Sequence, residues 1–224
     1  MKHIINKLNF GSELRHGMFN LDPTKYFTNH GSYGAVSKPV LNKRFELLLE
    51  QEKSPDKWFR FTRFELYNKN VDALAKYLQI RHKINNLVLC ENATESINVA
   101  LRSIDFNGSS DAILATTYTY KAIMNAIHFT SKYRLDEKNK IKVFVVDVKF
   151  PIKNVTELLN EFENKITEIV IEKKLRLRLA VIDSISCPTG MRYPVDDINR
   201  IIRKLSRESI ILVDGAHDLG LIFK

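Results

Sequence analysis

The chain has 224 residues, of which 44% are hydrophobic and 10% aromatic, and its formal charge at neutral pH is +9. This length and composition allow an ample core, which excludes an intrinsically disordered chain. No apolar run approaches the roughly 20 residues needed to cross a bilayer, so we expect no transmembrane helix and no membrane partner. The polar start lacks the pattern of a signal peptide, and we predict a cytoplasmic location.

The positive charge by itself does not predict a nucleic-acid-binding protein. Basic residues are spread among 26 acids, and the densest cluster, residues 173–178, lies between a helix-like and a strand-like stretch. A solvated helix end explains this cluster better than a nucleic-acid surface, which stays a weaker alternative. Cys90 and Cys187 fit no metal spacing, and we expect two reduced core cysteines. The six histidines form no HExxH motif, so we expect no zinc site.

The first eighty residues predict a helical region that follows an irregular start. Residues 1–25 are polar, and the loop 26–40 carries glycines that let a ligand come close to the backbone, although a plain loop explains them too. Apolar residues then recur at helical spacing over 40–51 and 58–78. We interpret these two helices as scaffolding or subunit interface.

The middle and end of the chain alternate short apolar runs with longer amphipathic stretches. This alternation predicts an α/β fold with a mostly parallel sheet, right-handed crossovers and helices on both faces. The expected strands are 86–90, 112–115, 141–147, 179–183 and 209–213, and the expected helices are 95–103, 120–131, 155–173 and 195–205.

Ligands of such sheets bind at the carboxyl ends of the strands, so the loops that follow the strands are the candidate site. The turn 91–96 runs into a helix whose free N–H groups could bind phosphate, but Asn92 or Thr94 could equally be a simple N-cap. Two later strands end in an acid, Asp183 and Asp214, and two tyrosines, Tyr118 and Tyr120, follow the second strand.

These loops suit a flat, phosphorylated ring that contains nitrogen. A dinucleotide fits less well because no GxGxxG follows a strand, and the GxxxxGK[ST] motif of a P-loop is missing.

Five motifs occur in the same order as in class V aminotransferases, which the chain resembles over about residues 26–220. They are residues 29–36, 92–95, 120–122, 186–190 and 213–217. Within this group the chain is most similar to the isopenicillin N epimerase-like and cysteine desulfhydrase-like branch. The resemblance implies fold type I, pyridoxal 5′-phosphate (PLP) as cofactor, and a homodimer with sites at the subunit interface.

The resemblance also implies a role for individual residues. Ala93 and Thr94 would hold the cofactor phosphate, Tyr120 would stack on the ring, and Asp214 would pair with the ring nitrogen. His217 would lie near the ring hydroxyl, with a surface histidine as the alternative. The remaining assignments are ring support by Asp183 and Thr189, and a substrate entrance lined by Asn29, His30 and Ser32.

Two departures from the family pattern qualify this interpretation. Residues 218–220 differ mildly from the residues that usually follow the motif 213–217 in the family. In addition, no lysine occupies the position at which the family forms its Schiff base with the cofactor. We therefore expect no catalytic residue in this chain. The expected organisation is an N-terminal arm with the substrate-entrance loop (1–50) and an incomplete PLP-binding large domain (51–224).

Two functions therefore remain open. The first is a PLP-dependent enzyme acting on amino acids, sulfur-containing ones included, of which this is an inactive N-terminal portion. The second is a non-catalytic module that binds PLP weakly or interacts with a relative.

Overall fold

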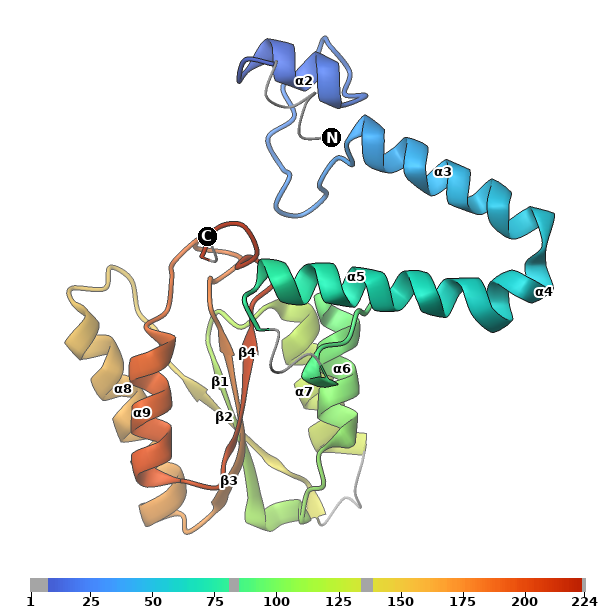
Figure 1. Ribbon diagram of the computed structural model, residues 1–224. Helices are drawn as coiled ribbons and strands as arrows, with labels where there is room; N and C mark the ends of the chain where they lie inside the picture. Colours follow the sequence, from blue (N-terminus) through green and yellow to red (C-terminus); the bar gives the residue numbers. More distant parts are fainter. Residues whose placement is uncertain (1–7, 81–84, 134–138, 223–224) are drawn as a thin grey trace. The chain divides into compact units, whose positions relative to one another are not determined.

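The computed structural model describes residues 8–80, 85–133 and 139–222 and divides the chain into two compact units, residues 1–88 and 89–224 (Figure 1). The first unit is helical, and the second is an α/β unit. The boundary predicted at residues 50 and 51 concerns the domains of the family and stays a prediction.

The first unit contains one helix that the sequence pattern did not predict. Residues Ser12–Met18 form α2, although residues 1–25 were expected to be irregular. Polar contacts support this short helix: the Glu13 carboxylate accepts a hydrogen bond of 2.8 Å from Asn9 Nδ2, and Arg15 Nη2 donates one of 2.6 Å to the Asp22 carbonyl oxygen. Such contacts leave no apolar periodicity in the sequence, which explains why the pattern missed the helix.

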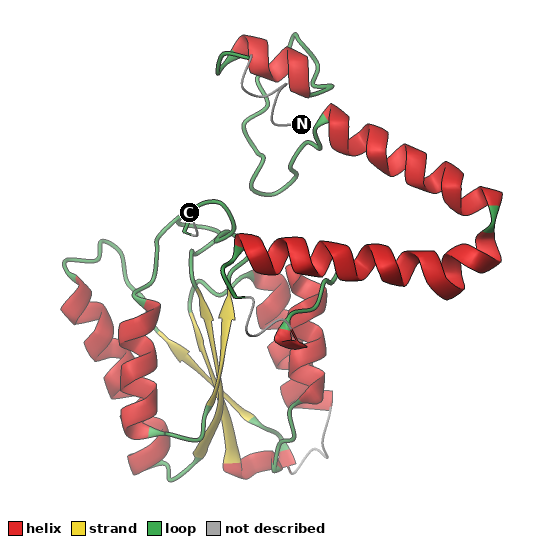
Figure 2. Cartoon of the chain, viewed as in Figure 1, coloured by secondary structure: helices red, strands yellow, loops and turns green. Residues whose placement is uncertain are grey.

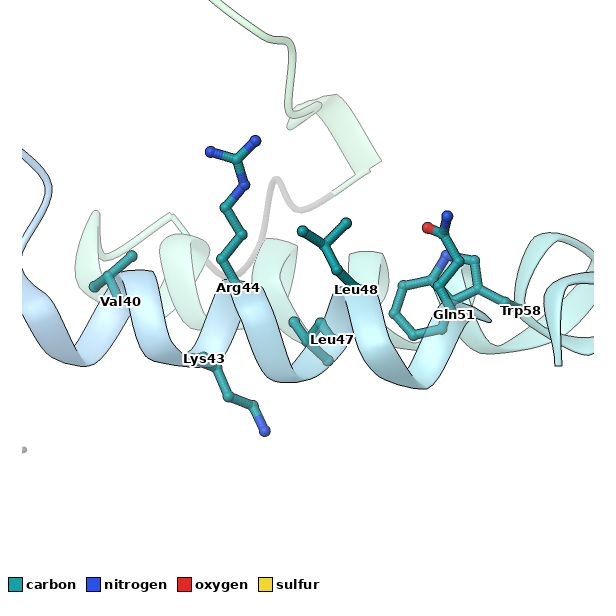
Figure 3. Close-up of a pocket in the computed structure, with 7 residues that line it drawn as sticks. All are labelled: Val40, Lys43, Arg44, Leu47, Leu48, Gln51 and Trp58. Atoms are coloured by element: carbon teal, nitrogen blue, oxygen red, sulfur yellow. The ribbon is translucent and has the colours of Figure 1, made fainter. Parts of the chain in front are cut away.

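The predicted helices of the first unit are confirmed. They are α3 (Lys38–Lys53), the single turn α4 (Pro55–Lys57), the π-helix η1 (Trp58–Thr62) and α5 (Arg63–Tyr77). None of the described residues of α3 is buried. Figure 3 shows a pocket of about 370 Å³ along this helix, lined by Val40, Lys43, Arg44, Leu47, Leu48, Gln51 and Trp58. The pocket contains none of the predicted site residues.

The second unit is built on a four-stranded parallel sheet (Figure 2). The strands β1 (Asp111–Thr116), β2 (Lys142–Val146), β3 (Arg176–Asp183) and β4 (Ile210–Asp214) lie in the order β2-β1-β3-β4. Strands β1 and β3 are central, and β1 is buried along its whole length. The predicted α/β class and the parallel sheet are confirmed.

Helices cover both faces of the sheet, as predicted. On one face, α6 (Ala93–Ser103) and α7 (Lys121–Tyr133) pack Ile97, Leu101, Ile123 and Ile127 against the sheet. The other face is covered by α8 (Val155–Thr167), the π-helix η5 (Glu168–Glu172) and α9 (Val195–Leu205), with a core that includes Phe162 and Ile202. Alternate residues of β1 pack into the two cores, because successive side chains of a strand point to opposite faces.

A β-bulge interrupts this alternation in β3. Ala112 is paired with Leu177, but the next residue of β1, Ile113, is paired with Leu179, so Arg178 is the extra residue. Leu177 consequently packs in the core under α8 and α9, whereas Leu179 packs in the core under α6 and α7. Arg178 Nε donates a hydrogen bond of 3.0 Å to the carbonyl oxygen of Asp105.

Two expectations from the sequence are wrong. Residues 86–90 are not a strand, and Val88 is 67% exposed. An extended segment is stable in a sheet only beside a strand that accepts its hydrogen bonds. None of the four described strands pairs with this segment. Cys90 and Cys187 are both exposed, since each lies in a loop and not in a core element. The basic cluster lies between a helix and a strand, as expected: exposed Lys173 and Lys174 follow the end of η5, and β3 begins at Arg176.

Candidate active site

The direction in which the chain winds reverses at β1, and the candidate site lies at this reversal. From β1 the chain crosses through α7 to β2 on one side, and then returns through α8 to β3 and through α9 to β4 on the other side. Such a switch point separates the loops at the carboxyl ends of two neighbouring strands and leaves a crevice for ligands. The loops concerned are those after β1 and β3.

Asp183 and Asp214 end neighbouring strands and are register partners at this edge. The apolar residues that precede them at alternate positions, Val181 in β3 and Leu212 in β4, both pack in the core beneath α6 and α7. By strand alternation, the two carboxylates therefore lie on that same face. Asp183 is 2% exposed and Asp214 is 7% exposed, so two acids lie buried side by side.

Asp183 is only partly satisfied by hydrogen bonds. The backbone N–H of Tyr120, just before α7, donates a bond of 3.4 Å to Asp183 Oδ1, while Oδ2 is buried and has no partner among the described residues. Burial, and next the neighbouring charge of Asp214, raise the pKa of Asp183 to about 6. The fold therefore leaves one buried carboxylate oxygen without a hydrogen-bond partner among the described residues.

Asp214 is held by the turn that follows it. The backbone N–H of Ala216 donates a hydrogen bond of 3.0 Å to Asp214 Oδ1, and the Ser184 N–H donates one of 2.9 Å to the Asp214 carbonyl oxygen. The second bond ties the loop after β3 to the end of β4. His217 follows in the same turn and is half-buried.

The amino end of α6 is formed by a capping pair. Asn92 Oδ1 accepts a hydrogen bond of 2.8 Å from the Glu95 N–H, and the Glu95 carboxylate accepts one of 3.0 Å from the Glu91 N–H. The simple capping role is therefore confirmed for Asn92. Ala93 and Thr94 are half-buried in the first turn, and their phosphate role stays a prediction.

Both α6 and α7 point their amino ends to the carboxyl edge of the sheet. Helix α7 begins five residues after β1 ends, and α6 ends shortly before β1 begins, so both run antiparallel to the strands (Figure 1). Their positive dipole ends thus lie at the edge and on the face that carry the two acids.

The loop after β3 contains one polar group that the sequence pattern did not reveal. Ser186 is fully buried and its hydroxyl oxygen has no hydrogen-bond partner among the described residues. Thr189, predicted to support the ring, is exposed, and its hydroxyl accepts a hydrogen bond of 3.3 Å from the Met191 N–H. The available signal was that Ser186 begins the motif 186–190 and lies three residues from both Asp183 and Thr189, but the burial of a serine cannot be predicted from its residue type.

A second missed feature is a buried hydroxyl network on the other face of the sheet. The Tyr193 hydroxyl lies 3.4 Å from Thr116 Oγ1, and Thr119 Oγ1 accepts a hydrogen bond of 3.0 Å from the Thr116 N–H. This network fixes the start of the loop that leads to Tyr120, whose ring is 43% exposed.

Asn29, His30 and Ser32 belong to the first unit, and all three are exposed. The His30 ring packs edge-on against Phe27 at 4.7 Å between centroids, and its Nδ1 accepts a hydrogen bond of 3.3 Å from the Ala35 N–H. Within the unit the loop is therefore organised around His30. The substrate role of these residues stays a prediction.

Neither a metal cluster nor a membrane span occurs in the described part of the chain. Among these residues no group of three or more His, Cys, Asp or Glu side chains could hold a metal ion. In the same residues, no helix has the length and apolar character that a membrane span requires.

The parallel sheet with helices on both faces and paired acids at its carboxyl edge defines an open α/β ligand-binding domain. The family model for class I and II aminotransferases matches residues 34–222, and the chain belongs to this family, which depends on PLP. The resemblance drawn from the motifs is confirmed at the level of PLP-dependent enzymes of fold type I, although the motifs pointed to class V.

Curated relatives with similar sequences include two desulfhydrase-like proteins. The L-cysteine desulfhydrase-like protein lolT2 of Epichloe uncinata is 29% identical over 203 residues, which is 90% of this chain and 41% of the relative. The putative L-cysteine desulfhydrase 2 of Oryza sativa subsp. japonica is 25% identical over 140 residues, 60% of this chain and 28% of the relative. The chain thus spans less than half the length of these relatives.

Solved structures confirm the fold. A mutant of C-DES with glycine covalently linked to the PLP cofactor superposes with a TM-score of 0.72 at 18% identity, covering 90% of this chain and 49% of that one. The complex of the cystine C-S lyase C-DES with its product cysteine persulfide gives a TM-score of 0.70 at 18% identity, covering 88% and 49%.

Proposed function

We propose that the α/β unit binds PLP and that the chain serves the chemistry of a cysteine desulfhydrase-like enzyme on a sulfur-containing amino acid. One observation carries the proposal: Asp183 and Asp214 are buried register partners at the carboxyl edge, on the face where α6 and α7 begin. A buried pair of acids next to two positive helix ends suits a ligand that combines a cationic ring with an anionic phosphate.

The polar groups present fit this cofactor. Buried polar atoms without partners are costly in a folded chain, and both Asp183 Oδ2 and the Ser186 hydroxyl are such atoms. A bound polar ring would supply partners to them. The N–H groups of Ala93 and Thr94, in the first turn of α6, would hold the phosphate, and the exposed Tyr120 ring would stack on the pyridine.

PLP, when bound, supplies an electron sink for a carbanion at the substrate Cα. The contribution of this chain is to bind and to hold charge. Asp214 would keep a proton on the ring nitrogen, because a buried carboxylate stabilises a neighbouring cation. His217 would donate to or accept from the ring hydroxyl, and Asp183 and Thr189 would support the ring.

The substrate class rests on the relatives, since the curated proteins that match are described as desulfhydrase-like. Asn29, His30 and Ser32 would line the substrate entrance. We further propose that the complete site forms in a homodimer located in the cytoplasm. Size-exclusion chromatography with light scattering tests the dimer, and microscopy of a tagged chain tests the location.

A second candidate function is a non-catalytic module that binds PLP or a relative. It is favoured by the chemistry of the site residues named above, which can bind the cofactor and hold charge but include no amine for its covalent attachment. The site residues of this chain would then bind the cofactor without turning over substrate. Sulfide release from L-cysteine in the presence of PLP separates the two candidates: release by the purified chain contradicts the module, and restoration by a family polypeptide that carries the lysine supports a divided enzyme.

The binding proposal is best tested with pyridoxamine 5′-phosphate, because PLP itself reacts with surface lysines. We expect saturable binding in equilibrium dialysis, with affinity reduced at least about tenfold in Asp214→Asn through loss of the charge partner. Tyr120→Ala should weaken binding several-fold, and Tyr120→Phe should retain it because stacking needs only the ring.

The matched control is Glu172→Gln, an exposed acid at the end of η5, near the amino end of β3 and thus at the opposite edge of the sheet, which should bind as the parent does. Equal affinity in the parent chain and in Asp214→Asn would overturn the proposed function.

A further inference from the structure

We infer that Asp183 and Asp214 act as one carboxylate pair, which shares a single proton in the free chain and releases it when a positively charged ring binds. The inference rests on the proposed function for the identity of the ring. It goes further in assigning Asp183 a positioning role: its charge state is set by Asp214, and it responds to the ligand.

The geometry of the pair is the first support. The two residues are partners in adjacent parallel strands, and neighbouring strands lie about 4.8 Å apart, so their side chains on the same face are close. Both are almost fully buried. Two carboxylates in such a site repel each other when both are charged, so one of them keeps its proton to a higher pH than an isolated aspartate does.

The donors around the pair do not offset the cost of two buried negative charges. Asp183 Oδ1 accepts a hydrogen bond from the Tyr120 N–H, and Asp214 Oδ1 accepts one from the Ala216 N–H. Asp183 Oδ2 has no partner among the described residues. Hydrogen bonding lowers the pKa of Asp183, but burial and Asp214 outweigh it and raise that pKa to about 6, which agrees with a pair that holds one proton.

Other titratable groups lie on the elements that surround the pair. Glu95 and Lys121 lie in the first turns of α6 and α7 and are exposed, whereas Tyr193 follows β3, and His217 and the half-buried Asp218 follow β4. Asp218 Oδ1 is buried and has no partner among the described residues. Burial raises the pKa of the Tyr193 hydroxyl, so this side chain stays neutral in the same range. The proton of the pair is therefore assigned to Asp183, and variants of the neighbouring groups serve as controls.

Binding of a cation changes the balance within the pair. A ring that carries a positive charge on its nitrogen stabilises both carboxylates in the ionised form, so Asp183 loses its proton to solvent as the ring enters. One proton leaves for each ring bound, no covalent bond forms or breaks besides the O–H bond of Asp183, and no oxidant is needed. The cofactor site would thus bind the ring more tightly as the pH rises through the range in which Asp183 titrates.

The first test is made on the free chain and needs no cofactor. The carboxyl carbon of Asp183, assigned with an Asp183→Asn variant, is followed by NMR in aspartate-labelled protein as the pH is raised. We expect a midpoint well above the ordinary value for aspartate, and a clear fall of this midpoint in Asp214→Asn. An ordinary midpoint, or one that Asp214→Asn does not change, would overturn the inference.

The second test is calorimetric titration with pyridoxamine 5′-phosphate at pH 5.5 in two buffers of different ionisation enthalpy. The ligand's own proton changes are common to all variants, so the difference between the parent and Asp183→Asn isolates the aspartate. We expect the parent to release up to one proton more than Asp183→Asn, and Asp218→Asn, which changes the other acid of the turn after β4, to release as many protons as the parent does.

The outcomes of the two tests separate the two proposals. Absence of any binding by the parent chain counts against the proposed function, while the NMR titration still decides whether the acids share a proton. Binding with no difference in proton release between the parent and Asp183→Asn overturns the inference and leaves the proposed function intact.

Discussion

Arg176 holds Asp111 with two parallel hydrogen bonds, Nε to Oδ1 at 2.6 Å and Nη2 to Oδ2 at 2.8 Å, across the amino ends of β3 and β1. Asp111 is fully buried, and its carboxylate also accepts a bond from the Asn107 N–H. Burial would raise the pKa of Asp111, but these hydrogen bonds and the Arg176 charge hold that pKa below its usual range. The pair therefore anchors the two central strands.

We expect Asp111→Asn to lower the free energy of unfolding by about 2 kcal/mol at pH 7, less than for a fully buried pair because Arg176 is half exposed. An acid with a depressed pKa stabilises the fold above about pH 4 and loses this effect as the pH falls through its folded value, so the difference between the two proteins should shrink in acid. Urea denaturation followed by circular dichroism, at pH 7 and at acid pH, measures the loss of unfolding free energy and its dependence on pH. The control is Glu163→Ala, which breaks the exposed pair with Lys204 and should cost under about 0.5 kcal/mol.

Asp183→Asn should make the free chain more stable at pH 7.5. The pKa of Asp183 rises from 3.8 to about 6 in the fold, so its stabilising effect is complete below about pH 4 and is lost as the pH rises through about 6. The difference corresponds to about 3 kcal/mol when both states are ionised. Urea denaturation at pH 4 and pH 7.5 should show the gain only at the higher pH; a similar gain at both values would contradict the assignment.

The π-helix η5 offers a matched pair of isoleucines for testing the core. Ile169 is fully buried under the sheet, while Ile171, two residues on, is 60% exposed. We expect Ile169→Ala to cost about 3 kcal/mol through lost burial and the cavity that remains, and Ile171→Ala to cost under about 1 kcal/mol. Thermal and urea denaturation of the two variants provide the comparison, and equal losses would mean that the helix packs differently.

Asn92→Ala should destabilise α6 by about 1 kcal/mol, because the Glu95 N–H loses its acceptor. Asn92→Asp keeps an acceptor and should retain most of the stability. Asn154 caps α8 in the same way, with a bond of 2.8 Å from the Glu157 N–H, so Asn154→Ala serves as the internal standard. Hydrogen exchange of the first-turn amides should speed up at the altered helix only.

The sequence pattern was sufficient to predict the sheet because its strands are apolar on both faces. Short runs without polar residues, such as 112–115, indicate strands that are buried on both faces. The stretches between the runs have apolar residues at the 3.6-residue period of an amphipathic helix. The positions of Asp183 and Asp214 at strand ends followed from the same pattern. Their pairing across the sheet did not, because the order of strands is a property of tertiary contacts.

Other features depend on contacts that periodicity does not encode. Residues 86–90 have the apolar composition of a strand, but a segment forms a strand only where a neighbouring strand pairs with it, and composition does not reveal that neighbour. The short helix α2 is held by polar contacts that its own Glu13 and Arg15 side chains make with the flanking loops. The buried Ser186 hydroxyl is another such case, because a serine is equally common on a surface.

The bulge at Arg178 has a consequence for evolution of the site. Strand β3 places Arg176 beside Asp111 at its amino end and Asp183 beside Asp214 at its carboxyl end. Both placements are possible in one strand only because the bulge accommodates one extra residue between Leu177 and Leu179. Deletion of Arg178 would oblige the strand to abandon the ion pair or to turn the acid to the opposite face. The contacts at its two ends thus fix the number of residues in β3. We expect evolution to tolerate substitutions in this strand but not insertions or deletions.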